Sequence, residues 1–140
     1  MFTISLFFAT ATLIAQQKPA YILYNAKGKK VSYKKMIRLL AEKDIVLFGE
    51  FHNNPIAHWL ELAVSKDLAE KKALVFGAEM FEADNQQALN DYLSGKLTAK
   101  GFDSSARLWS NYKTDYAPLV LFAKEKKAPF VATNIPRKYA

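Results

Sequence analysis

The 140-residue chain contains no cysteine, which excludes disulfide bonds, cysteine-ligated zinc and iron–sulfur clusters. For the same reason we expect no lipid anchor attached through a cysteine of this chain. Glycine and proline are scarce, with five of each, and no Gly/Ser-rich linker divides the sequence. These features indicate a single domain, and 51% hydrophobic residues are enough to build its core.

Acidic residues are fewer than basic ones, 13 against 20, which gives a formal net charge of +7. The lysines and arginines are spread along the chain and are not interleaved with aromatic residues, so we predict no nucleic-acid partner. Such a distribution is typical of a solvated surface. It is also compatible with an anionic ligand or with peripheral contact to a phosphate-rich membrane face.

The amino terminus carries no charge from Met1 to Gln17, and residues 2–15 are apolar apart from serine and threonine. This run has the length of the apolar region of a secretory signal, and it is too short to span a membrane. We therefore predict a signal peptide over residues 1–17, followed by one domain over residues 18–140. An exported chain of this kind is expected in the periplasm or cell envelope.

The rest of the chain alternates short apolar runs with amphipathic stretches, which predicts an α/β fold with a parallel β-sheet flanked by helices in βαβ units. A small amino-terminal β-hairpin is expected around the polar turn at 25–29. A three-stranded parallel sheet would leave an edge uncovered, so we expect an incomplete domain that needs a partner or its own dimer. The predicted strands are 45–48, 73–78 and 129–133, and the predicted helices are 33–41, 55–72, 85–93 and 116–124.

Both histidines lie between Gly49 and Trp59, where the first predicted strand gives way to a helix capped by Asn54, with Pro55 at its first position. Glu50 and His52 would then emerge at the carboxyl end of that strand. This is the edge where open α/β sheets bind ligands.

Two further predicted strands add polar residues to the same edge. Glu79 follows the second strand, and Asn134 and Arg137 follow the third. Glu50, His52 and Glu79 together would offer oxygen and nitrogen ligands to a divalent metal ion, or a general base with an orienting partner. Arg137 would suit a carboxylate ligand, although it fits a surface cation equally well.

His58 lies roughly 200° around the predicted helix from Ile56, away from the apolar stripe. We therefore expect it to be exposed to solvent, or covered by a ligand or a second subunit, and not to meet His52 within one chain. Trp59 lies on the stripe and is expected in the core. Trp109, Tyr112 and Tyr116 could line a flat hydrophobic ligand, and a tyrosinate can bind ferric iron, but packing is the default for each.

Four motifs occur in a fixed order: 46–55 with His58, 77–81, Trp109 with 116–118, and 132–137. In this order they resemble the ChaN-like haem-binding family, which belongs to a wider group with the Tiki metalloproteases. The resemblance runs from about Tyr21 to the last residue and covers the amino-terminal half of the family pattern only. It implies haem as cofactor, stacked between the subunits of a homodimer, and a role in iron or haem uptake. The haem site that it implies contains His52, Asn54, Pro55, His58 and Arg137.

Haem binding is therefore the function that the sequence favours over an enzyme. The alternative is a metal-dependent hydrolase of the Tiki-protease or esterase type, in which Glu50, His52 and Glu79 hold the metal and polarise water. The metal site of such proteases contains a glycine-x-x-histidine motif and a glutamate on the following strand. The resemblance matches these to Gly49 to His52 and to Glu79 in this chain. A third reading is a partial domain that does nothing alone.

Overall fold

A computed structural model describes residues 18–140 of the chain, so the predicted signal peptide at 1–17 lies outside the described residues. Two parallel strands, β1 (Phe76–Glu82) and β2 (Phe130–Asn134), form the sheet. Phe76 pairs with Phe130, and the register shifts between Ala78 and Glu82. The predicted α/β class with a parallel sheet is confirmed.

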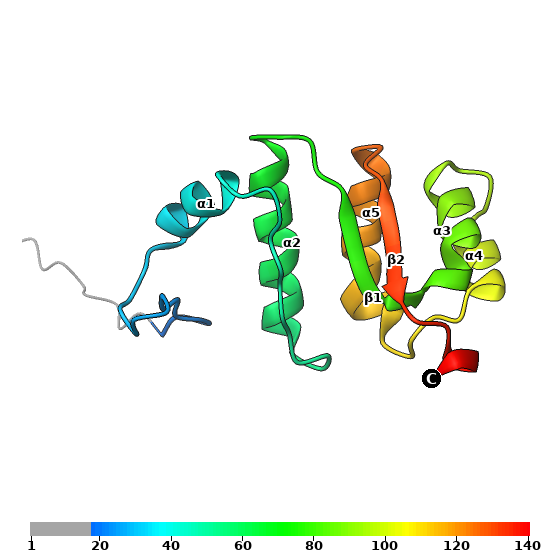
Figure 1. Cartoon of the computed structure of the whole chain (residues 1–140), viewed down its shortest axis with the longest axis horizontal. Coiled ribbons are helices and arrows are strands. Elements are labelled where there is room, and N and C mark those ends of the chain that lie inside the picture. The colour runs from blue at the N-terminus through cyan, green and yellow to red at the C-terminus, as the bar shows by residue number, and fades with distance from the viewer. Residues whose placement is uncertain (1–17) are drawn as a thin grey trace, which may run out of the picture.

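Helices lie behind this pair of strands and on both sides of it (Figure 1). α5 lies behind the sheet, α3 and α4 lie beside β2, and α2 stands on the other side, between the sheet and α1. Within residues 18–140, no helix combines the length and the apolar character needed to cross a membrane. The helices are α1 (Tyr33–Ala41), α2 (Pro55–Ala69), α3 (Gln86–Leu93), α4 (Ala99–Ser105) and α5 (Ala117–Glu125), with shorter turns η1 (Ala83–Asn85), η2 (Tyr112–Tyr116) and η3 (Arg137–Tyr139).

The main core is aromatic and lies between the sheet and helices α3 to α5. Phe81 is 1% exposed, and its ring lies 5.6 Å from that of Phe130, 6.0 Å from Tyr112 and 6.1 Å from Phe102. A second, smaller cluster of Ile37, Val64 and Leu68 joins α1 to α2. The fold therefore has a well-packed carboxyl-terminal part that holds one edge of the site in place.

The predicted strand at 45–48 is wrong. Its residues are largely exposed, with Ile45 at 79% and Leu47 at 91%, and no strand of the described chain pairs with them. A cavity of about 630 Å³, lined by Val46 to Gly49 on one side and by Val75 to Gly77 on the other, separates this segment from β1. Without a neighbouring backbone to complete its hydrogen bonds, an apolar run of this kind does not form a ladder.

Three other predictions need adjustment. The second strand begins later and runs further than 73–78, so Glu79 lies within β1 and not after it. The expected hairpin is reduced to one antiparallel bridge, Tyr24 to Lys30, closed by Gly28 at φ 68°. Trp59 is not in the core but 54% exposed, and its ring packs at 5.9 Å from that of Tyr21. Trp59 is not part of the smaller core, where α2 contributes the buried Val64 and Leu68 and the partly buried Leu60.

Candidate functional site

The start of α2 organises the site, and local chemistry fixes it. Asn54 is the N-cap, and its side-chain oxygen accepts hydrogen bonds from the backbone N–H groups of Ile56 at 3.0 Å and Ala57 at 3.1 Å. Pro55 occupies the first helical position, as predicted. These two residues turn the chain, and the preceding loop carries Glu50 and His52 over the first turn of the helix.

His52 lies on the surface of the site, with 51% of its side chain exposed. Its Nδ1 is 3.2 Å from Oε1 of Glu50, and its Nε2 is 3.7 Å from Oε1 of Glu79. The structure thus brings together the three residues that we predicted as metal ligands. An ionised carboxylate only accepts hydrogen bonds, so Nδ1 carries the proton and Nε2 keeps a free lone pair.

An aromatic group supports this histidine. The rings of His52 and Trp109 meet edge to face at 4.8 Å, and Trp109 meets Tyr116 in the same way at 5.7 Å. Trp109 also lines a surface depression of about 630 Å³ together with Arg107 and Arg137. Of the three aromatic residues singled out from the sequence, Trp109 therefore lies where a flat ligand can reach it.

The two tyrosines have other roles. Tyr112 is buried in the main core and does not line the site. Tyr116 is 2% exposed, and its hydroxyl donates to Oε1 of Glu50 at 2.9 Å. Burial first, and then this hydrogen bond, raise the pKa of Tyr116 far above its ordinary value. The phenol stays neutral and acts as a donor, so Tyr116 is unsuited to bind iron as a tyrosinate.

His58 is not exposed, contrary to our expectation, since 5% of its side chain meets solvent. Its Nε2 donates to the backbone carbonyl of His52 at 3.1 Å, so the two histidines do meet within one chain. The ring of Tyr116 covers it edge to face at 4.8 Å. The helical angle places His58 off the apolar stripe of α2, but the loop before α2 and the η2 turn cover that side of the helix and bury His58.

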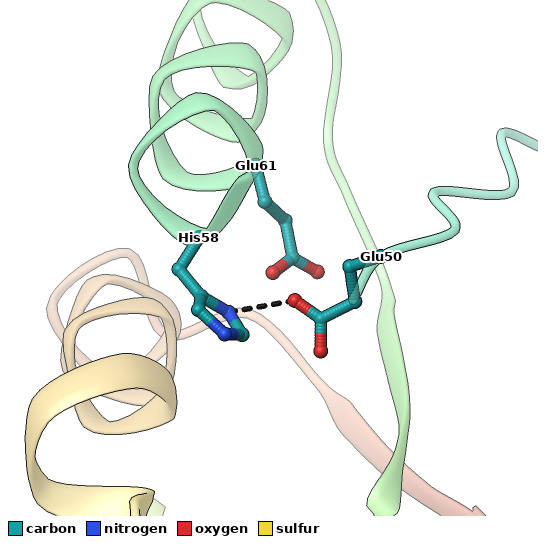
Figure 2. A group of neighbouring side chains, drawn as sticks. All are labelled: Glu50, His58 and Glu61. Atoms are coloured by element: carbon teal, nitrogen blue, oxygen red, sulfur yellow. Dashed lines mark ion pairs between the residues drawn. The ribbon is translucent and has the colours of Figure 1, made fainter. Parts of the chain in front are cut away.

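Glu50, His58 and Glu61 form a cluster at the centre of the site (Figure 2). One ligand atom from each lies within 4.8 Å of the others, and Oε2 of Glu50 is 2.6 Å from Nδ1 of His58. Burial first, and then the charge of Glu50, raise the pKa of Glu61 to about 7. Sequence analysis missed Glu61, although its spacing of three from His58 places both on one helix face.

Arg137 lies just beyond β2, in η3. Its backbone N–H donates to Oε2 of Glu82 at 2.8 Å, and Arg107 binds the same oxygen at 2.9 Å. These hydrogen bonds, that of Arg107 above all, hold the pKa of Glu82 below its ordinary value. The Arg137 side chain is exposed at the depression that Trp109 lines, so it lies at the predicted edge. Its role there stays a prediction.

Comparisons with known proteins give a matching family model and a solved structure of similar fold. A family model described as haem-binding uptake, Tiki superfamily, ChaN, matches residues 36–140. A solved structure described as cofacial heme binding to ChaN of Campylobacter jejuni matches with a TM-score of 0.68 and 21% identity. The match covers 84% of this chain and 49% of that chain, so the present chain spans about half the length of its structural relative. No curated protein matches the chain.

Proposed function

We propose that this chain, which belongs to the ChaN family of haem-binding uptake proteins in the Tiki superfamily, binds haem beside His52. The observation that carries the proposal is an exposed imidazole whose Nδ1 is held by Glu50, while its Nε2 makes no hydrogen bond within residues 18–140 and lies 3.7 Å from the exposed carboxylate of Glu79. Imidazole is a common axial ligand of haem iron, and a hydrogen bond at the other ring nitrogen orients the ring and raises its basicity.

The surroundings of His52 suit the rest of a porphyrin. Trp109 offers an aromatic surface next to the imidazole, and Arg107 and Arg137 border the adjoining depression. Arginine binds carboxylates such as the haem propionates. Arg107 is already engaged by Glu82 and Asp84, which leaves Arg137 as the side chain that we assign to a propionate. His58 is buried and lies behind His52, so it supports the loop and does not reach the iron.

Titrating haemin into the purified chain tests this function. We expect a Soret band that shifts and saturates at one haem per chain, because an imidazole replaces a solvent ligand on the iron. The same titration with the chain unfolded in denaturant is the control, since His52 is then no longer positioned. An unshifted spectrum at micromolar haemin would rule out haem binding by this chain.

We also propose that the chain forms a homodimer through the unpaired segment at 45–48. Ile45, Leu47 and Val75 are 79%, 91% and 68% exposed, and Leu47 and Val75 line the cavity next to β1. Apolar side chains gathered beside an unpaired extended segment are typical of an interface between chains. A second copy would bury them and supply the missing edge contacts.

Sedimentation of the chain tests this dimer. We expect a concentration-dependent dimer, and we expect Leu47→Asp to shift it to monomer, because a carboxylate in an apolar interface is strongly unfavourable. Leu39→Asp is the matched control, since Leu39 is 43% exposed on α1 and does not line the cavity beside β1. A monomer at all concentrations would contradict the proposal.

A role in haem uptake at the cell envelope is a further part of this proposal. The charge-free residues 1–17 support it, since they have the character of an export signal. Detection of the processed chain outside the cytoplasm, by cell fractionation, would test it.

A further inference from the structure

We propose that Glu50, His58 and Glu61 form a binding site for a divalent metal ion of the zinc type, behind the proposed haem ligand His52 and joined to it through Glu50. These three side chains point toward one another from two segments, the loop before α2 and the first turns of α2 (Figure 2). The sequence predicts Glu50, His52 and Glu79 as metal ligands. The site proposed here keeps Glu50, but it contains the largely enclosed His58 and Glu61 in place of the exposed His52 and Glu79.

The protonation of His58 carries the argument. Its Nε2 lies 3.1 Å from the carbonyl oxygen of His52, and a carbonyl only accepts hydrogen bonds, so Nε2 bears the proton. In a neutral imidazole the lone pair is then on Nδ1. That atom is buried, has no hydrogen-bond partner, and is directed at the two carboxylates. A histidine that binds a metal characteristically donates its other ring N–H to a carbonyl or carboxylate in this way.

Glu50, like His58, has one side-chain atom that is hydrogen-bonded and one that has no hydrogen-bond partner among the described residues. Its Oε1 accepts hydrogen bonds from Tyr116 at 2.9 Å and is 3.2 Å from His52. Its Oε2 is buried and has no hydrogen-bond partner, although Nδ1 of His58 is 2.6 Å away, because the contact lacks the geometry of a hydrogen bond. Two buried atoms with lone pairs this close repel each other unless a cation or a proton lies with them.

Glu61 completes the ligand set. It brings a second carboxylate within 4.8 Å of the other two ligand atoms. One imidazole nitrogen and two carboxylate oxygens are a mixed set that favours zinc and its neighbours over calcium or magnesium. Three protein ligands leave one coordination position for water or another small ligand.

Metal titration of the chelator-treated full chain tests the site, with Zn²⁺ followed by calorimetry and Co²⁺ by its visible absorption. We expect one ion per chain and, for His58→Gln and for Glu61→Gln, a loss of affinity of roughly tenfold or more. The matched control is Glu79→Gln, which removes an exposed ligand of the other set and whose side chain pairs with His52 and not with the three proposed ligands. This control should keep the wild-type affinity.

Several outcomes decide between the alternatives. Absence of stoichiometric binding by the wild type overturns the proposal and indicates a proton shared by Glu50 and His58. The proposal is also overturned if His52→Ala and Glu79→Gln lose metal binding while His58→Gln and Glu61→Gln keep it. That result would place the metal ion at the exposed residues His52 and Glu79. Circular dichroism checks each variant for folding, and Glu61→Gln carries the test if His58→Gln does not fold. A haemin titration of the same samples tests the haem proposal independently of the metal proposal, because haem binding at His52 does not require the metal ion.

Discussion

Replacing His52 by alanine is expected to weaken haemin binding by roughly tenfold or more, which corresponds to about 1.4 kcal/mol for each factor of ten. The imidazole is the exposed nitrogen ligand of the site, with half of its side chain open to solvent and an Nε2 that makes no hydrogen bond in the described part of the chain. Alanine removes that donor and also the edge-to-face contact with Trp109. The measurement is a haemin titration followed by the Soret band.

The control for this prediction is Glu79→Gln, which changes a neighbouring side chain without removing an iron ligand. Glu79 is 66% exposed and lies 3.7 Å from Nε2 of His52. Contacts between exposed charged groups contribute little, so the variant should bind haemin almost as the wild type does. Equal affinity of His52→Ala and the wild type would show that another residue holds the iron.

Replacing Phe81 by alanine is expected to lower the free energy of unfolding by about 3–5 kcal/mol. Phe81 is 1% exposed at the centre of the aromatic core, against Phe102, Tyr112 and Phe130. Its loss leaves a cavity between β1, β2 and α4. Since whole domains are stable by about 5–15 kcal/mol, such a change removes a large share of the total.

Urea unfolding followed by circular dichroism measures this effect, and Phe51→Ala supplies the matched control. Phe51 is 80% exposed in the loop before α2, so the same chemical change should alter stability by no more than about 0.5 kcal/mol. A similar loss in both variants would mean that the aromatic cluster around Phe81 is not the stabilising core. The two exchanges remove the same atoms, so only burial distinguishes them.

Much of this architecture was predictable because it depends on contacts close in sequence. Asn54 caps α2, as the sequence predicts, and Ser32 caps α1 in the same way through the backbone N–H of Lys35 at 3.3 Å. Strand, helix and strand follow in the predicted order around a parallel sheet. His52 does lie next to Glu50 and Glu79, as predicted, although residues 45–48 before it form no strand and Glu79 lies within β1 and not at its end.

Residues 45–48 show where sequence reasoning failed. Their apolar, β-branched character is typical of a strand, but a strand exists only when a neighbouring backbone completes its hydrogen bonds. In residues 18–140 no strand pairs with them, and a cavity separates them from β1. The four residues themselves do not show whether a neighbouring strand will be present in the folded chain.

His58 and Glu61 show the same limit for the site. The sequence by itself determined that both lie on one face of α2, since their spacing of three is a property of the helix. Only the tertiary structure decided that this face is buried, because the covering groups come from the loop at Glu50 to His52 and from Tyr116, 58 residues along the chain from His58. Capping and helical spacing act over a few residues, whereas burial and strand pairing depend on segments that meet only once the chain has folded.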